Sequence, residues 1–538
     1  MGNAAEALHT RGPGRVALGS GPQATTSKEN SCEAAEDSCE GRNIRLQGTC
    51  PARGGAPRAH AQGALATLCG MPLLVVGLAT GLVYAVWVAW VPLLPANVYV
   101  PLLDLGKITG YTWTSALLYV SLLGALYGLY AFGYRAARQA SLTGIFAFGG
   151  LFCLELLLAY PATAVDVFGY IAHGRLFAIH GLNPFIVTPA VVRTEPILPY
   201  LAYPDEPTQY GPLWVLLGGG LALLGHGNLL AEVLLYKSVG ALAHLAGAGL
   251  VFAIACRLGV GTCQARASSY LFLWNPMLLW ELVGNAHNDG LMMLGGLAGV
   301  YLLLRTNGLL SLPAVMLGGL VKLPVLAIAP LLGLASLRRR PAVAIEGVLL
   351  AVGLAVAIYR PFWEGPDTLT ALRRTDLFTA SLGSVLRLGL APLLGLDLAT
   401  STARGISLGA FGGLVLLALA LSWRAGADRR RVLGLAYLVL LAGVLLGTTW
   451  FQAWYVTWPF AFGAALGSTR RHLEVALLSL GGLLQYLVFI YLWVMGVFPP
   501  GENLGVQVAA YAAVVGPLAV GWLAYATVEA RRARCTRR

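Results

Sequence analysis

The sequence predicts an all-α, polytopic membrane protein with roughly thirteen or fourteen transmembrane helices. Of its 538 residues, 57% are hydrophobic and only 11% are charged, and the mean hydropathy is +0.71. A soluble domain carries about 25% charged residues. The apolar runs are continuous over roughly 17 to 28 residues, unlike the short alternating strands of a barrel. Because only helices and closed barrels satisfy the backbone in lipid, these runs indicate transmembrane helices.

The formal net charge of +12 would also suit a protein that binds nucleic acid. Most Lys and Arg residues, however, lie in short clusters between the apolar runs, which is the positive-inside pattern of membrane proteins. We therefore expect a lipid bilayer and no nucleic acid as partner. The eight cysteines show no metal-ligand spacing, and we expect neither a metal nor another cofactor.

The elements follow in order along the chain. Residues 1–62 are rich in small and charged residues without apolar periodicity, which predicts a disordered tail. A short apolar piece, Leu213–Leu224, is followed by a long span, Leu229–Cys256. The other predicted spans are Leu68–Trp90, Trp113–Phe132, Leu142–Tyr160, Ser268–Val283, Gly290–Leu304, a pair within Leu309–Leu337, Ala342–Tyr359, Ile406–Trp423, Val432–Leu446, Tyr455–Leu466, Leu473–Val494 and Val506–Ala526.

Charge sets the expected orientation, because clusters of Lys and Arg stay on the cytoplasmic side. The clusters lie at Arg135 and Arg138, Arg257 and Arg266, Arg338–Arg340, Arg429–Arg431, Arg470 and Arg471, and Arg531–Arg538. One topology satisfies them all: the N-terminus is inside, and Leu213–Leu224 lies in or dips into the outer interface without crossing. Three polar segments then meet outside, 164–210, 284–289 and 450–454, with the Arg360–Arg387 loop joining them. We expect an integral protein of the plasma membrane with an extracytoplasmic active site.

The first polar segment carries the strongest signal for chemistry. Asp166, Tyr170 and His173 are spaced i, i+4 and i+7, so they share one face of a helix. A carboxylate at a membrane boundary is costly without water or a partner, which makes Asp166 a candidate general base for a hydroxyl group. The alternative is that Asp166 caps a helix. Arg175 falls half a turn away and could contact a lipid phosphate or a neighbouring loop.

The second segment follows an Asn–Pro break at Asn275 and contains Asn285, His287, Asn288 and Asp289. So many polar residues at the end of a span are unusual in lipid. Their carboxylate and amide groups suit hydrogen bonds to sugar hydroxyls. A metal site at His287 and Asp289, or a plain turn between helices, remains an alternative.

Two cations near Pro-broken spans are candidates for binding a phosphate. Lys322 lies within an apolar run and is followed by Pro324, and Arg360 directly precedes Pro361. A buried ammonium needs a counter-charge, which a lipid-linked phosphate could supply. Glu281 or Asp289 is the structural alternative for Lys322.

Aromatic residues gather in the third segment, Trp450–Tyr455, together with the amide of Gln452. Aromatic side chains at an interface usually form an anchoring belt. Trp454 and its neighbours could equally stack on a sugar ring with Gln452 as hydrogen-bond partner.

The ordered set of these motifs resembles the polyprenol-phosphomannose-dependent α-mannosyltransferases, which belong to the GT-C class of integral-membrane glycosyltransferases. The motifs are A-x-D-x-x-x-Y-x-x-x-G-R, N-P-F, Y-G-P-L with Tyr210, W-N-P, G-N-x-H-N-D, V-K-x-P and W-F-Q-x-W-Y, over roughly Leu142–Pro459. The resemblance implies a GT-C fold, a polyprenyl-phosphate-sugar donor, and a base aspartate in the first external loop of the family core, here Asp166. Since this loop follows the third span, a two-helix addition must precede the core. The expected parts are therefore a tail (1–62), a two-helix addition (63–140), a GT-C catalytic core (141–467), and C-terminal helices with a basic tail (468–538).

The function expected from this resemblance is transfer of a hexose, most simply mannose, to an acceptor hydroxyl of a glycan or glycolipid. One carboxylate suffices because the leaving phosphate needs no proton, which predicts inversion from a β-linked donor to an α-linked product. The alternative is a transporter or flippase of a lipid-linked sugar, which also has broken helices and intramembrane polar residues. Transporters usually place such residues at the midplane within repeated halves, and the sequence shows no internal repeat.

Overall fold

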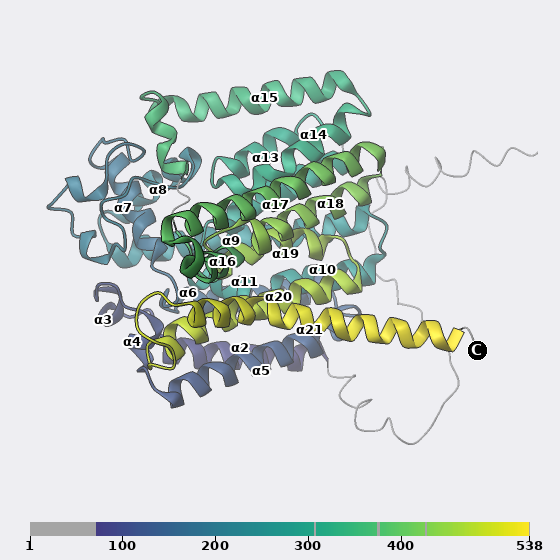
Figure 1. Ribbon diagram of the computed structural model, residues 1–538, viewed down its shortest axis with the longest axis horizontal. Coiled ribbons are helices and arrows are strands. Elements are labelled where there is room, and N and C mark those ends of the chain that lie inside the picture. Colours follow the sequence, from purple (N-terminus) through teal and green to yellow (C-terminus); the bar gives the residue numbers. More distant parts are fainter. Residues whose placement is uncertain (1–71, 306–307, 374–376, 426–427, 537–538) are drawn as a thin grey trace, which may run out of the picture. The chain divides into compact units, whose positions relative to one another are not determined.

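The computed structural model describes residues 72–305, 308–373, 377–425 and 428–536, and within these ranges the chain is helical. No β-strand forms among the described residues, only isolated bridges at Pro92–Ala159 and Thr379–Trp450. The predicted all-α class is confirmed. The expected tail, 1–62, lies outside the described residues. Figure 1 shows the long helices running side by side, with the irregular segments around α7 and α8 at one end.

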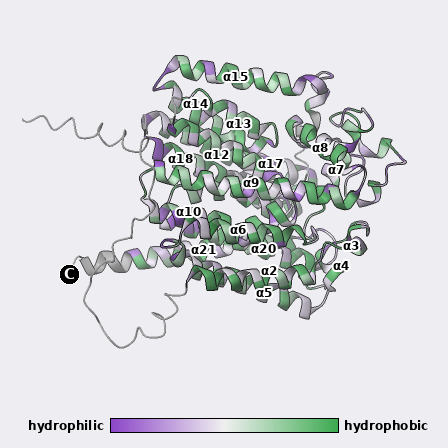
Figure 2. Cartoon of the chain, turned by 180° about the vertical axis from the view of Figure 1, so that it is seen from behind, coloured by the Kyte–Doolittle hydropathy of each residue, from purple (hydrophilic) through white to green (hydrophobic). Residues whose placement is uncertain are grey.

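Eight helices of the described ranges are long and apolar enough to cross a membrane. Large apolar side chains remain exposed along them, for example Leu78, Leu117 and Leu349, and Figure 2 shows this apolar colouring along α2, α5 and α15. Such surfaces suit lipid contact, as expected of an integral membrane protein. The eight are α2 (Leu73–Trp90), α5 (Trp113–Ala137), α9 (Leu229–Arg257), α15 (Pro341–Tyr359), α17 (Leu396–Ala425), α18 (Arg429–Ala442) with η9 (Gly443–Gly447), α20 (Thr469–Tyr486) with η11 (Leu487–Trp493), and α21 (Leu504–Thr536).

The remaining helices are shorter, and they account for the difference from the thirteen or fourteen spans expected. The helix α12 (Asp289–Arg305) covers a predicted span in full but has only 17 residues. Several others lie where a predicted span is broken or shortened: α6 (Leu142–Leu157), α10 (Thr262–Leu273), α11 (Pro276–Leu278) with η5 (Leu279–Gly284), α13 (Ser311–Gly319), η6 (Leu323–Ile328), α14 (Ala329–Leu337) and α19 (Thr457–Ala465). Others lie in the connecting segments: α3 (Pro95–Val98), α4 (Leu105–Thr109), α7 (Asp166–Ala178), η3 (Pro189–Val191), η4 (Leu198–Tyr200), α8 (Pro212–Gly225), η7 (Arg360–Phe362), η8 (Pro366–Arg373), α16 (Leu382–Leu394) and η10 (Ala453–Val456).

The Asn–Pro sequence breaks the expected span at Asn275. The helix α10 ends at Leu273, and the Asn275 side chain accepts a hydrogen bond from the backbone of Leu278, starting a new turn. The following six residues, η5, form a π-helix. π-Helical turns are rare and are found mostly at functional sites. This segment delivers the chain to the polar residues 285–289.

A second break lies at Lys322, whose extended backbone separates α13 from η6. The start of α8 joins this break, because the amides of Gly211 and Leu213 donate to the carbonyls of Val321 and Leu320 over 2.9 and 3.0 Å. A Cβ atom at Gly211 would overlap the Leu320 carbonyl, so the close approach needs glycine. The contact places the segment before α8 beside Lys322.

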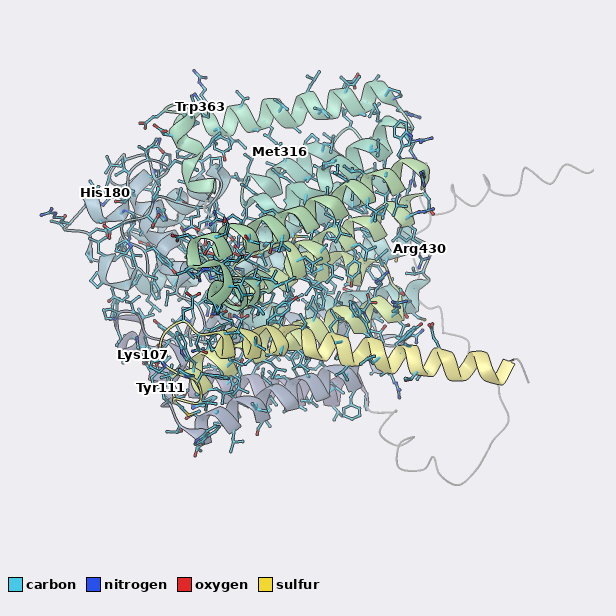
Figure 3. The ribbon with its side chains drawn as sticks, in the orientation of Figure 1. Lys107, Tyr111, His180, Met316, Trp363 and Arg430 are labelled. Atoms are coloured by element: carbon cyan, nitrogen blue, oxygen red, sulfur yellow. The ribbon has the colours of Figure 1, made fainter. Side chains whose placement is uncertain are left out.

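The two ends of the helical bundle carry different side chains. At one end arginines fix neighbouring helix ends through backbone carbonyls: Arg338 donates to Trp423, Arg429 to Leu304 and Arg430 to Leu466. Figure 3 shows Arg430 at this end and His180 at the opposite end, near α7. The arginine clusters and the polar segment 164–210 therefore lie at opposite ends, as the charge pattern predicts.

The chain between α15 and α18 differs from the expectation. A helix, α16, forms where a loop was expected, and α17 begins at Leu396 instead of near Ile406. Thr400, Ser401 and Arg404 lower the local hydropathy and hide the first turns of this span in the sequence. The difference matters because it places Arg404 inside a candidate membrane span.

Candidate functional site

A cavity of about 470 Å³ lies where α7, the segment before α8, the Lys322 break and the 450–455 segment meet. We call it the main cavity. Six of the predicted site residues line it: Asp166, His173, Tyr210, Lys322, Gln452 and Trp454. The three polar segments singled out in the sequence therefore supply walls of one cavity, or the layer behind them.

Asp166 is the first residue of α7 and lines the main cavity. Its Oδ1 accepts a hydrogen bond from the Tyr210 hydroxyl over 2.9 Å. Among the described residues no group bonds to its Oδ2, and the N-cap position belongs to Val165, which makes no side-chain cap. The alternative of a helix cap is therefore wrong. The geometry leaves one carboxylate oxygen available to a molecule in the cavity.

The phenol of Tyr210 is set up as a donor to Asp166. Burial raises the pKa of Tyr210 well above its usual value, and the Asp166 carboxylate raises it further. The hydroxyl group is therefore protonated at neutral pH. The Tyr210 ring also packs edge-on against Tyr170, with 4.9 Å between ring centroids.

The predicted face of α7 divides into two layers. His173 lines the main cavity, and burial lowers its pKa to about 4, so the imidazole is neutral at pH 7. Tyr170 is buried behind the cavity wall, and its hydroxyl lies 3.5 Å from Nδ1 of His287. Tyr170 thus connects α7 to the 285–289 segment instead of lining the cavity.

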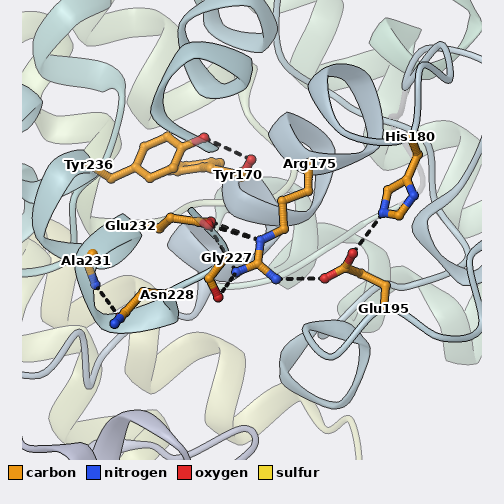
Figure 4. Close-up of polar contacts among 9 residues, drawn as sticks. All are labelled: Tyr170, Arg175, His180, Glu195, Gly227, Asn228, Ala231, Glu232 and Tyr236. Atoms are coloured by element: carbon orange, nitrogen blue, oxygen red, sulfur yellow. Dashed lines mark hydrogen bonds and ion pairs between the residues drawn. The ribbon is translucent and has the colours of Figure 1, made fainter. Parts of the chain in front are cut away.

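Arg175 requires a correction, because it does not line the main cavity. Its buried guanidinium pairs with Glu195 over 2.7 Å and with Glu232 over 3.0 Å (Figure 4). His180 contacts the second oxygen of Glu195 over 2.8 Å. Burial alone would raise the pKa of Glu195, but the hydrogen bonds from His180 and Arg175 outweigh it and the net pKa lies below the usual range. The sequence left a lipid phosphate and a neighbouring loop as possible partners of Arg175, and the contact with Glu195 is to a neighbouring loop.

The 285–289 segment forms a buried layer behind the cavity. The backbone of Ala286 has a φ of +60°, a strained conformation for a residue with a Cβ atom. Asn285 donates to Glu281 over 2.9 Å and to Thr163 over 2.6 Å. The side-chain amide of Asn288 is buried, and neither its nitrogen nor its oxygen makes a hydrogen bond within the described part of the chain.

His287 and Asp289 face different partners, which argues against a metal held by this pair. The His287 ring stacks on Trp454, with 3.8 Å between ring centroids. Asp289 instead accepts from Trp458 over 2.6 Å and from Lys322 over 2.8 Å. Direct substrate contacts were predicted for His287 and Asp289. The structure instead places these two residues behind Trp454 and Lys322, which do line the cavity.

Lys322 lines the cavity while its charge is matched by buried Asp289. Its ammonium also lies 5.2 Å from the ring centre of Tyr455 and 5.7 Å from that of Tyr210. The sequence left Glu281 and Asp289 as candidate counter-charges for Lys322, and the structure pairs Lys322 with Asp289. The Nζ atom still borders the cavity, where an anion could meet it.

Arg360 requires the second correction. It is exposed in η7 and lines neither the main cavity nor the adjoining one described below. The same turn is anchored by Phe362, which packs on Phe177 and Phe185. In contrast, Gln452 and Trp454 line the cavity, with Trp450 and Tyr455 beside them.

Lys237, in the middle of α9, supports the site although no sequence motif pointed to it. Its buried Nζ donates to the carbonyls of Ala159 and Gly284, which precede the Asp166 and 285–289 segments. Lys237 therefore joins the two segments behind the site. A single Lys in the long apolar run Leu229–Cys256 is the signal that could have found it.

The family model described as "Alpha-(1->6)-mannopyranosyltransferase, N-terminal domain" matches residues 66–338. The chain belongs to this family. The matched region includes Asp166, Tyr210, the 285–289 segment and Lys322, so it covers most of the cavity described above.

Individual relatives agree with the family. Alpha-(1->6)-mannopyranosyltransferase A of Mycobacterium tuberculosis is 26% identical over 376 residues, 65% of this chain and 68% of the relative. A probable alpha-(1->6)-mannopyranosyltransferase of Mycolicibacterium smegmatis is 30% identical over 36% of this chain and 34% of its own. Alpha-(1->6)-mannopyranosyltransferase B of Corynebacterium glutamicum is 24% identical over 29% of this chain and 26% of its own. The chain is thus an integral-membrane mannosyltransferase of the GT-C type, as the motif order predicted.

Proposed function

We propose that this enzyme transfers mannose from a polyprenyl-phosphate donor to a hydroxyl group of a glycan or glycolipid, forming an α-(1→6) linkage. The observation that carries the proposal is the free Oδ2 of Asp166 in a cavity also lined by Lys322, Gln452 and Trp454. The relatives named above are α-(1→6)-mannosyltransferases, which supports the sugar and the linkage.

The chemistry follows from a single base. Asp166 removes the proton of the acceptor hydroxyl as its oxygen attacks the anomeric carbon of the donor. The bond between that carbon and the phosphate oxygen breaks, and its electron pair leaves with polyprenyl phosphate. Asp166 then releases its proton to solvent. Attack opposite the leaving group inverts the anomeric centre, from a β-linked donor to an α-linked product.

The positive charges support an extracytoplasmic reaction. The arginines at residues 338, 429 and 430 lie at the end of the bundle opposite α7, where they bond to backbone carbonyls. Clusters of arginine stay on the cytoplasmic side of a membrane. Asp166 would then face the outside of the plasma membrane, where a lipid-linked sugar can reach the cavity from the bilayer.

Reconstitution with a defined donor tests the proposal. The purified full-length enzyme is mixed with polyprenyl-phosphate mannose and an α-linked mannose oligosaccharide, and both the extended glycan and free polyprenyl phosphate are measured. We expect the two products in equal amounts, and the extended glycan should be cleaved by an α-(1→6)-mannanase. Movement of the intact donor between vesicle leaflets without glycan extension would contradict the proposal and favour a flippase.

A further inference from the structure

A second, smaller cavity of about 180 Å³ adjoins the main one. Gln209, Trp450 and Tyr455 line both. We call it the side cavity. Its other wall comes from α17, which contributes Arg404 and Leu408, and from the end of η9.

Arg404 is an unusual cation, because it lies in a candidate membrane span and no carboxylate of the described residues pairs with it. Its buried Nε makes no hydrogen bond to any residue that the structure describes, and its described contact is with the Phe378 ring, 5.9 Å from the guanidinium carbon to the ring centre. Arg387 contacts the same ring but pairs with Glu502 over 2.5 Å. A charged side chain within a span is costly and usually marks a functional site.

The charges around the two cavities leave a role for Arg404. Lys322 and Arg404 are the Lys and Arg side chains among the described lining residues. Lys322 is already matched by Asp289, and Asp166 would repel an anion placed next to it. The charge of Arg404, which no described carboxylate matches, can offset this repulsion for an anionic substrate.

The side cavity also reaches the surface that suits lipid contact. Leu408 lies one helical turn after Arg404, lines the side cavity and is 51% exposed. Arg404 and an open apolar edge therefore lie next to each other on α17. A molecule with a charged head and an apolar tail matches this pair of features.

We propose that the side cavity binds the phosphate of a lipid-linked substrate, with Arg404 as its ligand and the apolar tail leaving past Leu408. This inference rests on the proposed function, because it places the donor phosphate beside the cavity of Asp166. Guanidinium groups bind phosphate through paired, charge-assisted hydrogen bonds, which a lysine cannot reproduce in full.

Binding of a short lipid phosphate to the full-length enzyme tests the proposal. Farnesyl phosphate, farnesol and inorganic phosphate are titrated by calorimetry at one fixed detergent concentration. We expect farnesyl phosphate to bind more tightly than the other two. Arg404→Gln should weaken it roughly tenfold to hundredfold, the usual effect of losing a charge-assisted contact, and Arg404→Lys by less. Arg424→Gln, near the other end of α17, is the matched control and should change nothing.

A second variant keeps the test valid if Arg404→Gln does not fold. Leu408→Trp should weaken the binding of farnesyl phosphate and leave the binding of inorganic phosphate unchanged, because the larger side chain narrows only the apolar edge of the side cavity. Unchanged farnesyl phosphate binding in a folded Arg404→Gln protein would overturn the proposal. Equal binding of farnesol would show an apolar lipid site, and equal binding of inorganic phosphate a site for free phosphate, and either result overturns it too.

Failure of this inference can be told apart from failure of the proposed function. If Arg404→Gln changed neither mannosyl transfer nor farnesyl phosphate binding, the phosphate site in the side cavity would be rejected and the proposed function would stand. Arg404-dependent binding in an enzyme that transfers no mannose would keep the site and reject the function.

Discussion

Tyr210 donates a hydrogen bond to Asp166, with 2.9 Å between the phenolic oxygen and Oδ1. The two residues come from the segment before α8 and the first turn of α7, and both line the main cavity. This bond fixes one carboxylate oxygen and leaves the other toward the cavity. Tyr210 is therefore a positioning residue for the proposed base.

Tyr210→Phe should lower kcat with little change in KM, because the ring and its packing stay and only the hydrogen bond to the carboxylate is lost. A hydrogen bond to a charged group is worth about 1.5–3 kcal/mol, so we expect roughly a tenfold to hundredfold fall in rate. In an Asp166→Asn background the same change should add almost nothing. Additive losses in the double variant would contradict the role assigned to Tyr210.

Lys237→Met should destabilise the protein and slow transfer, because two buried carbonyls, those of Ala159 and Gly284, lose their donor. Each orphaned group costs about 1–3 kcal/mol. Ser238→Ala is the control, since within the described residues its hydroxyl bonds to the Leu234 carbonyl of the same helix and to no other group. Thermal unfolding in detergent measures the loss. A Lys237→Met protein as stable as the control would show that the two segments hold together without this residue.

Arg175→Met should cost about 3–5 kcal/mol of stability, because it leaves buried Glu232 without a partner. Replacing the pair together, Arg175→Met with Glu232→Leu, should recover much of this loss, because the fully buried carboxylate is gone and Glu195 keeps its contact with His180. Denaturant titration of the three proteins separates the cases. If Arg175→Met instead kept full stability and lost substrate binding, the structural role given to this residue would be wrong.

The pKa of His173 predicts a pH dependence of stability. Its pKa is about 4 in the folded protein and about 6.5 when unfolded. Between these values the unfolded chain binds a proton that the folded chain does not, so stability falls as the pH drops from 6.5 to 4. Melting temperatures across this range should fall more steeply for the wild type than for His173→Gln. Parallel curves would contradict the buried, neutral imidazole.

Much of the architecture could be predicted from the sequence, because hydropathy and helix breakers act locally. The breaks at Asn275 and Lys322 and the short helix α8 are confirmed. The start of α17 was misplaced because Arg404 interrupts its apolar run, although such an interruption is itself a functional signal. The hydropathy pattern alone does not tell whether a cation such as Arg404 faces a substrate or is buried in the membrane in a structural role.

The site was harder to predict where partners come from distant segments. The charge pattern predicted that Asp166 and Tyr210 lie on the same side of the membrane, and the structure places both in one cavity with Lys322. The sequence could not show that Arg175 pairs with Glu232, which lies 57 residues away on another helix. Helical spacing defines a face but does not identify which element covers it.

The role of Asp166 as general base can be measured through mannosyl transfer by the Asp166→Asn variant. The substitution is nearly isosteric and keeps an acceptor for the Tyr210 hydroxyl, so folding and farnesyl phosphate binding should persist. Loss of a general base predicts a fall in turnover of roughly 10² to 10⁴, measured at equal enzyme concentration with polyprenyl-phosphate mannose. Transfer within about threefold of the wild type would show that Asp166 is not the base, because loss of a base costs far more than that.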